Sequence, residues 1–425
     1  MMTCAEAIQY IHSNTWYKSS QGLSRIRTLL AAIGNPQDSV RCIHVGGTNG
    51  KGSVCAMLDS ILRAAGYRVG MFTSPYIRCF QERMRADGEL IRDEELAEIT
   101  EMIRPHVEAM EERPNEFEVI TAIGFEFFRR RGVDIVVLEV GLGGRLDPTN
   151  VIKDPLLSII TDIDFDHMAQ LGNTIQAIAV EKAGIVKEGY PCLYGGRENS
   201  ACRTIRAISE ARHAPFHTVD RSDYRVHSTS LEGTVFDFQQ YQNLELPLLG
   251  SYQPSNAAIV LTALVILGEQ GIGCSEEAVR TGLKNVRWPA RFELLHRDPI
   301  VICDGGHNPQ GIGAAVKSIQ TYFPEQKVVI VSGVMKDKDY DEMIEKLKPV
   351  AKHICTVTPP SGRSLTAAEY ASHFAAHKIP ATPFETATEA LRAAMAEAKQ
   401  DSCPVICLGS LYLYSSIVEA LEELA

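Results

Sequence analysis

The sequence lacks the features that mark membrane-spanning, secreted and zinc-knuckle proteins. No apolar run approaches the roughly 20 residues that a membrane helix needs. The opening residues, MMTCAEAIQYIHS, hold no basic stretch followed by an apolar one, as a signal peptide would. The eleven cysteines are scattered and form no Cys-x-x-Cys pair, which indicates reduced thiols rather than disulfides or a zinc site. We therefore expect a cytoplasmic protein that has no membrane partner.

Basic residues are fewer than acidic residues. The chain has 42 Lys and Arg residues against 53 Asp and Glu residues, a net charge of −11, which argues against a nucleic-acid partner. A small anionic substrate is not excluded, because it needs only a local cluster of Lys, Arg, helix N-termini and metal ions. The length of 425 residues is too great for one ordinary core, so we expect two domains, in a chain that acts as a monomer.

Helical stretches alternate with short β-branched runs, which predicts βαβ units and a parallel sheet covered on both faces. The expected strands are 42–45, 135–140, 156–161, 300–303, 328–332 and 405–408, and the clearest helices are 52–65, 94–110, 119–131 and 310–322. Residues 218–249 alternate polar and apolar side chains, which predicts an antiparallel hairpin at the end of the first domain. The segment 284–291, with Trp288-Pro289, is the expected linker.

The sharpest local signal is CIHVGGTNGKGSVCAML at residues 42–58. An apolar strand leads into a Gly-rich turn and then a helix, which is the setting of a phosphate loop. Glycines let backbone N–H groups face a triphosphate, the Lys51 ammonium can reach its outer phosphates, and the Ser53 hydroxyl can reach a metal ion. Because Gly52 separates Lys51 from Ser53, the strict pattern is not met, and an ordinary tight strand-to-helix turn is the alternative. The expected fold is α/β: a P-loop-containing parallel-sheet ATPase domain, residues 1–285, followed by a smaller Rossmann-like domain, residues 286–425.

Three further residues of the first domain are candidates for chemistry. Glu139 lies near the carboxyl end of an apolar strand, where an open α/β sheet binds its ligand, so it could hold Mg²⁺ or pair with a helix lysine. His167 follows another strand end and could face the same ligand, although a lone histidine is more often structural. Lys182 lies near the end of a helix that starts at about Thr174, where a lysine is usually a solvated charge.

Five segments, in this order along the chain, together resemble those of a known family of enzymes: GTNGKGS, TSPYIRCFQERMR, EVGLGGRLDPTN, DHMAQLGNTIQAIAVEKAGIVK and DGGHNP. From about Ser24 to the C-terminus the chain resembles the folylpolyglutamate synthase and dihydrofolate synthase family, which belongs with the muramyl peptide ligases. The resemblance implies an ATP-dependent ligase that adds L-glutamate to tetrahydrofolate through an acyl phosphate. Whether dihydropteroate is also a substrate stays open, because Tyr76 and Asn115 stand where the family commonly has His and Thr.

The resemblance also implies roles for individual positions. For ATP it implies Thr48, Asn49, Gly50, Lys51, Gly52, Ser53, Asn256, Arg291 and Asp304. For two Mg²⁺ ions it implies Ser53, Ser74, Glu139, His167 and Lys182, with Lys182 carbamylated by CO₂. For the folate or dihydropteroate it implies Asn115, Glu116, Phe117, Glu118, Leu146, Asp147 and Pro148. The implied catalytic residues are Lys51, Lys182 and His307. The sequence does not identify the base for the glutamate amine, for which His307 and Asp304 are candidates.

Two other functions stay open from the sequence. A muramyl peptide ligase would share the chemistry and differ in its acceptor. A non-catalytic nucleotide switch would need the phosphate loop and one metal ion, but no second domain with DGGHNP. The dependence of ATP hydrolysis on carboxylate and amine substrates separates the three.

Overall fold

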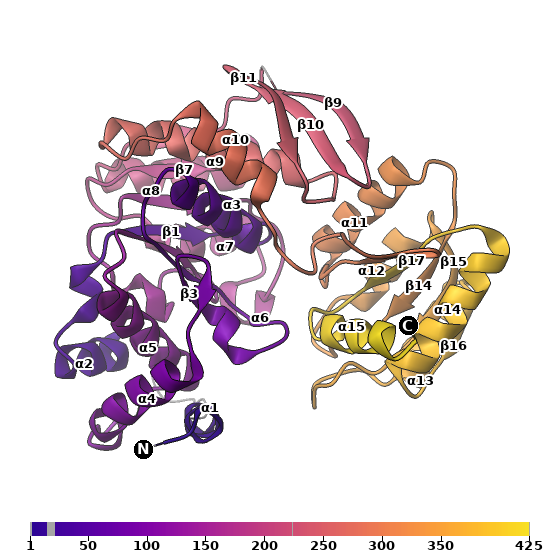
Figure 1. Cartoon of the computed structure of the whole chain (residues 1–425), viewed down its shortest axis with the longest axis horizontal. Helices are drawn as coiled ribbons and strands as arrows, with labels where there is room; N and C mark the ends of the chain where they lie inside the picture. Colours follow the sequence, from indigo (N-terminus) through magenta and orange to yellow (C-terminus); the bar gives the residue numbers. More distant parts are fainter. Residues whose placement is uncertain (1, 15–21, 223, 425) are drawn as a thin grey trace. The chain divides into compact units, whose positions relative to one another are not determined.

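The computed structural model describes residues 2–14, 22–222 and 224–424 (Figure 1). The chain forms two compact units: Met1–Asp223 with Asn256–Val286, and Tyr224–Ser255 with Arg287–Ala425. None of the described helices is long and apolar enough to cross a membrane. All eleven cysteines are free thiols, and none of them is exposed.

The first unit is built on an eight-stranded sheet with the order β4-β3-β2-β5-β1-β6-β7-β8. Its strands are β1 Cys42–Gly46, β2 Val69–Phe72, β3 Met84–Ala86, β4 Glu89–Leu90, β5 Ile135–Glu139, β6 Leu157–Ile160, β7 Cys192–Tyr194 and β8 Phe216–Thr218. All neighbouring strands are parallel except for the β2–β3 and β3–β4 pairs. β1 lies between β5 and β6, with Val45 opposite both Glu139 and Ile159, so the phosphate loop leaves the middle of the sheet.

In the described part of the chain, ten α-helices carry residues of this unit. They are α1 Cys4–Ser13, α2 Ser24–Ala32, α3 Lys51–Ala64, α4 Asp93–Glu108, α5 Glu116–Arg131, α6 Met168–Leu171, α7 Ile175–Lys182, α8 Ser200–Ala211, α9 Gln253–Glu269 and α10 Glu276–Asn285. The strands expected at 42–45, 135–140 and 156–161 are confirmed as β1, β5 and β6, which have buried residues throughout because the helices cover both faces.

The second unit holds a six-stranded sheet with the order β12-β13-β17-β14-β15-β16. Its strands are β12 Glu293–Arg297, β13 Ile300–Cys303, β14 Val328–Ser332, β15 Ala351–Thr356, β16 Ala381–Pro383 and β17 Val405–Leu408. Its helices are α11 Pro309–Tyr322, α12 Tyr340–Leu347, α13 Ala367–Ala376, α14 Ala387–Asp401 and α15 Leu413–Leu424. Only β12 is antiparallel to its neighbour, so the expected second α/β domain is confirmed.

The expected hairpin at 218–249 differs from the structure in two ways. It is a three-stranded antiparallel sheet of β9 Arg225–Ser230, β10 Gly233–Phe238 and β11 Tyr241–Leu246. These residues group with the second compact unit, whereas the sequence placed them at the end of the first domain. Alternation reveals a strand that is half buried, but it does not reveal which core the strand packs on. The division at 285/286 remains a prediction, and the second unit resumes at Arg287.

A buried histidine lies in the middle of β1. His44 is fully buried, and its Nε2 lies 2.9 Å from the Thr149 hydroxyl. That hydroxyl donates in turn to Asp147, so it accepts from the His44 N–H. Burial, with the nearby charge of Lys187, lowers the pKa of His44 from 6.5 to about 3. The folded protein therefore holds His44 neutral at a pH where the unfolded chain would protonate it.

This histidine predicts a loss of stability in acid. Between pH 6.5 and about 3 the unfolded chain binds one more proton at His44, so the free energy of unfolding falls as the pH falls through that window. The expected slope from this group is about 1.4 kcal/mol per pH unit. Urea unfolding from pH 7 to pH 4 should show a shallower decline for His44→Gln than for the original chain. Equal slopes in both proteins would contradict the assignment.

Candidate active site

The loop after β1 has a backbone that requires glycine at two positions. Gly47 has a φ of 134°, and a Cβ there would lie 1.9 Å from the Thr161 hydroxyl oxygen. Gly50 has a φ of 86° and precedes the first residue of α3, and a Cβ there would lie 2.8 Å from Asn256 Oδ1. Side chains other than glycine are disfavoured at both positions. Asn256 of α9 therefore lies against the start of α3, as a residue that contacts the nucleotide would need to.

The segment that follows β6 holds this loop in place. The Thr48 N–H donates to the Asp162 carbonyl at 2.7 Å, and the Thr161 hydroxyl donates to the Asn49 carbonyl at 2.6 Å. The Thr48 hydroxyl bridges the carbonyl and the N–H of Asp164, at 3.1 and 3.0 Å. These bonds fix the loop at the carboxyl edge of the sheet before any ligand binds.

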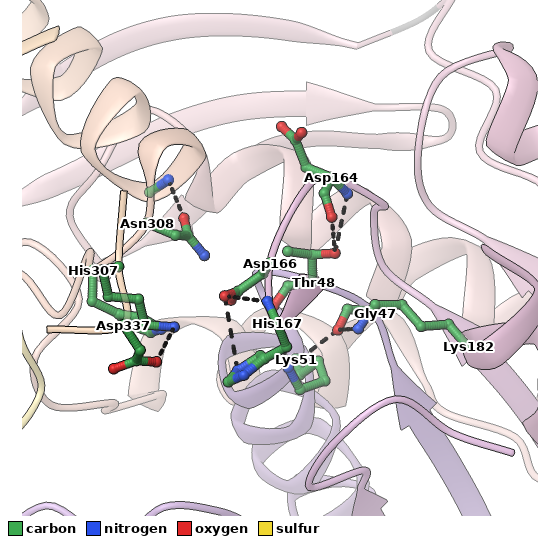
Figure 2. A network of polar contacts seen from close by, with 12 residues as sticks. Gly47, Thr48, Lys51, Asp164, Asp166, His167, Lys182, His307, Asn308 and Asp337 are labelled. Atoms are coloured by element: carbon green, nitrogen blue, oxygen red, sulfur yellow. Dashed lines mark hydrogen bonds and ion pairs between the residues drawn. The ribbon is translucent and has the colours of Figure 1, made fainter. Parts of the chain in front are cut away.

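Two lysines meet at one carbonyl of the loop (Figure 2). Lys51 Nζ lies 3.2 Å from the Gly47 oxygen, and Lys182 Nζ donates to the same oxygen at 2.8 Å, so the two nitrogens are at most about 6 Å apart. The side chain of Lys182 is buried, which contradicts the alternative of a solvated charge at a helix end. Burial and the Lys51 charge lower the pKa of Lys182 to about 7. Two ammonium groups this close favour an anion between or beside them.

Carboxylate and hydroxyl oxygens lie at the same edge of the sheet. Glu139 ends β5 and is 5% exposed, and its Oε2 accepts the N–H of Ser74 at 3.2 Å. Ser53 is buried in the first turn of α3. Among the residues that the structure describes, no group of three or more His, Cys, Asp and Glu side chains forms a cage for a metal ion. Magnesium that is bound together with a nucleotide usually needs only one or two carboxylates beside phosphate and water, so this donor set fits Mg²⁺–ATP.

His167 is accompanied by a carboxylate that sequence reasoning missed. Asp166 Oδ1 accepts the His167 N–H at 2.9 Å and lies 3.8 Å from Nε2 of its ring, as Figure 2 shows. The Asp166 charge also acts on Lys182, where it opposes the fall in pKa. The signal for it was present in the sequence, because aspartates alternate at positions 162, 164 and 166 directly after the strand.

The two segments expected to contact the folate come together in the first unit. A Cβ on Gly141 would lie 2.6 Å from the Phe117 ring, so α5 packs against the loop that leads to Leu146 and Pro148. Asp147 orders that loop by accepting the N–H groups of Leu142 and Thr149, at 2.8 and 3.0 Å.

Three of the expected folate-contacting residues have structural partners at the start of α5. Asn115 caps the helix and exchanges hydrogen bonds with Glu118. Glu118 also pairs with Arg25 at 3.0 Å, and Glu116 pairs with His12 at 3.0 Å. These contacts explain Asn115 and Glu118 without a ligand, and a folate role for any of these residues stays a prediction.

The remaining candidates lie in the second unit. Asp304 follows β13 and is 4% exposed, and burial raises the pKa of its carboxyl group. His307 Nδ1 lies 2.8 Å from the Gly305 oxygen, and a Cβ on Gly305 would lie 2.5 Å from Nη1 of Arg291. Asp304 and His307 thus belong to one loop, and Arg291 lies against it.

Known protein families match both domains, and individual known proteins are similar over nearly the whole chain. The Mur ligase middle domain matches residues 45–264, and the Mur ligase glutamate ligase domain matches residues 290–411. A dihydrofolate synthase/folylpolyglutamate synthase of Bacillus subtilis is 40% identical over 82% of this chain and 84% of its own. A folylpolyglutamate synthase of Lacticaseibacillus casei is 36% identical over 99% of both chains. The crystal structure of Mycobacterium tuberculosis folylpolyglutamate synthase, complexed with ADP and AMPPCP, superposes with a TM-score of 0.89 at 30% identity, over 99% of this chain and 98% of that one. With the phosphate loop and both domains in place, the chain belongs to the folylpolyglutamate synthase/dihydrofolate synthase family of Mur ligases.

Proposed function

We propose that the protein is an ATP-dependent ligase that adds L-glutamate to tetrahydrofolate and also to dihydropteroate. The observation that carries the proposal is the phosphate loop of β1 and α3, where Lys51 and Lys182 converge on one carbonyl, with the buried Glu139 at the end of the strand next to β1. The full-length similarity to folylpolyglutamate synthases supplies the substrate class. One of the similar structures is a complex of a folylpolyglutamate synthase with AMPPCP and folate, which supports nucleotide and folate as the joint ligands.

The proposed reaction has two steps that balance in atoms and charge. A carboxylate oxygen of the folate attacks the γ-phosphorus of ATP, which forms an acyl phosphate and releases ADP. The neutral amine of glutamate then attacks the acyl carbon, the amide forms, phosphate leaves, and the amine gives up one proton to a base. Phosphorylation is needed because a carboxylate is anionic and a poor electrophile near pH 7. His307 or Asp304 would accept the amine proton.

In this scheme each first-unit residue has a defined task. The glycine loop directs N–H groups at the triphosphate, and the Lys51 ammonium neutralises charge that builds on the transferred group. Ser53, Ser74, Glu139 and His167 would hold the two Mg²⁺ ions. Those ions would supply charge neutralisation and orientation of the phosphates. Asn256 would bind the adenine, because it already lies against Gly50 at the start of α3.

We further propose that Lys182 is carbamylated. An amine must be neutral to attack CO₂, and the pKa of Lys182 is lowered to about 7, so a large share of it is neutral near that pH. The Lys182 ammonium first loses one proton to become the neutral amine, and the amine loses a second proton as its nitrogen bonds to the carbon of CO₂. The cation thus becomes an anion with two oxygens. Those oxygens would serve Mg²⁺ better than an ammonium group could.

The carbamate predicts a dependence on dissolved CO₂. Ligation should fall severalfold in buffer stripped of CO₂ and recover when bicarbonate is added. The protein should also show a ¹³C carbamate signal after incubation with labelled bicarbonate. Lys182→Ala should lack that signal. A normal signal in Lys182→Ala would place the carbamate elsewhere.

The function is tested by following ADP release with different acceptors. The protein is given ATP, Mg²⁺ and glutamate with tetrahydrofolate, with dihydropteroate, or with a muramyl peptide precursor. We expect ADP and a glutamylated product with the first two acceptors only. Release with the muramyl acceptor alone would favour a muramyl peptide ligase, and release that needs neither acid nor amine would favour a nucleotide switch. The match of residues 290–411 to a glutamate ligase domain argues against a switch.

We also propose that the enzyme acts as a monomer in the reducing cytoplasm. The eleven free cysteines support a reducing compartment, because thiols at this number would be at risk of pairing in an oxidising one.

A further inference from the structure

Besides the crossing at 223/224, the chain passes between its two units after Ser255 and again after Val286. Tyr252 lies just before the first of these crossings, and Phe292 lies just after the second. One carboxylate oxygen binds both: the Tyr252 hydroxyl donates to Asp304 Oδ2 at 2.7 Å, and the Phe292 N–H donates to the same atom at 2.9 Å. We call these three residues the clasp.

The clasp is tied to the main sheet of the second unit. The Asp304 N–H donates to the Cys407 carbonyl of β17 at 2.8 Å, which fixes the position of its side chain. The other carboxylate oxygen, Oδ1, accepts the Gly306 N–H at 2.7 Å, so the clasp also sets the loop that carries His307. A displacement of Asp304 would therefore move that loop.

Both connections are anchored on the second-unit side of the crossings. Before the first, the N–H groups of Gly250 and Ser251 donate to Tyr322 and Ser318 of α11, at 3.1 and 2.9 Å. After the second, Ala290 and Phe292 have φ values of 55° and 52°, which are strained for residues with a Cβ. Such strain persists only where the surroundings hold it. The bonds from Phe292 to Asp304 and from the Gly305 N–H to the Ala290 carbonyl, at 2.8 Å, provide that restraint.

The bonds of the clasp are of the strong kind. Asp304 is 4% exposed, so its charge is balanced by donors of the protein rather than by water. A hydrogen bond to a buried carboxylate is stronger than one between neutral groups, and the loss of a donor leaves part of the charge without compensation. Tyr252 remains a donor throughout the working pH range, because burial and the Asp304 charge raise the pKa of its hydroxyl.

We propose that Tyr252 is a positioning residue of the ligase: through Asp304 it joins two of the interunit connections, those after Ser255 and after Val286, to the 304–308 loop. The clasp thereby holds the 304–308 loop in one shape on the second-unit side of both connections. The kinetic part of this inference rests on the proposed ligase function, and the structural part does not.

Hydrogen exchange of the free protein tests the structural part. Tyr252→Phe keeps the ring and removes only the hydroxyl. We expect the amides of 249–255 and of 287–293 both to exchange at least about fivefold faster. Phe292 in the second segment donates to the same Asp304 oxygen that Tyr252 in the first segment can no longer bind. Tyr370→Phe is the matched control, since Tyr370 is buried in the core of the same unit and packs on Phe374; it should leave both segments at the original rate. Asp304→Asn keeps the side-chain shape with one acceptor oxygen, and it should loosen the same two segments.

Kinetics provides the second readout. In Tyr252→Phe we expect kcat for ligation to fall about tenfold and the KM for ATP to rise by a smaller factor, because Asp304 is disturbed while the phosphate loop of the first unit is untouched. Faster exchange in 249–255 alone, or an unchanged kcat, would overturn the inference. If the original protein ligates glutamate to no folate acceptor, the proposed function fails, while the exchange experiment still decides whether the clasp exists.

Discussion

Lys51→Ala should abolish ligation while the protein stays folded. Among the described residues, the hydrogen bonds of the Lys51 ammonium go to the carbonyls of Gly47 and Thr48, both at 3.2 Å, so its removal breaks no ion pair there. In the reaction it neutralises charge on the phosphoryl group in transit, and a cation in that role contributes about 10³-fold or more to the rate. The expected result is a fall of kcat by at least that factor with Tm within about 2 °C of the original. ADP release with tetrahydrofolate and glutamate, together with calorimetry, measures both quantities.

A surface lysine provides the control for Lys51. Lys153 is paired with Asp38 at 3.1 Å, and its side chain is 67% exposed. An ion pair of this kind contributes about 0–1 kcal/mol, so Lys153→Ala should change neither rate nor Tm appreciably. If Lys51→Ala ligates at the original rate, the loop after β1 does not bind the triphosphate, and the site must be sought elsewhere.

Glu139→Gln should also remove activity, by a different route. Glutamine keeps the volume and an oxygen that can still accept the Ser74 N–H, and it removes the negative charge that Mg²⁺ needs. Loss of several kcal/mol of charge stabilisation corresponds to about a 10³-fold fall in kcat. Titration of Mg²⁺ in the presence of ADP, followed by calorimetry, should show weaker binding in the variant than in the original protein.

Glu126→Gln is the control that separates the loss of Mg²⁺ binding in Glu139→Gln from the loss of stability that replacement of any buried carboxylate can cause. Glu126 on α5 is 1% exposed and pairs with Arg129 and Arg130, both at 2.7 Å. Its substitution should lower Tm, because two arginines lose their partner, and it should leave kcat and Mg²⁺ binding as they were. A normal rate in Glu139→Gln would contradict the metal assignment.

The regular elements near the site were predictable because their signals are local. β1, β5 and β6 are apolar runs bounded by glycines or polar turns, and the Gly-rich sequence at 46–53 needs left-handed backbone that glycine provides. Placement of Glu139 at the carboxyl end of a strand followed from the same pattern. The family resemblance, rather than these patterns, supplied the roles of Asn256, Arg291 and Asp304, which are far from the loop in sequence.

Other features depend on tertiary contacts that no local pattern encodes. The position of Lys182 at the end of α7 predicts a solvated charge, and only the packing around it shows that it is buried on the Gly47 carbonyl. The resemblance implies Asn115 and Glu118 as folate contacts, which stays a prediction, and their part in the cap of α5 appears only in the structure. The clasp joins Tyr252 to Asp304, 52 positions later and beyond the first unit's last helices, so the two could not be paired from sequence.

The state of the cysteines gives the protein a built-in reporter of local opening. Cys55 lies buried in α3 of the first unit, and Cys303 lies buried on β13 of the second. Burial raises the pKa of both thiols well above the usual value, so a thiol-specific reagent meets almost no reactive thiolate while each unit is closed. Modification of either cysteine therefore requires local opening of the unit that contains it. Mass spectrometry of the two cysteine-containing peptides would give the labelling rate at each site, and hence the rate of opening of each unit, without any engineered probe.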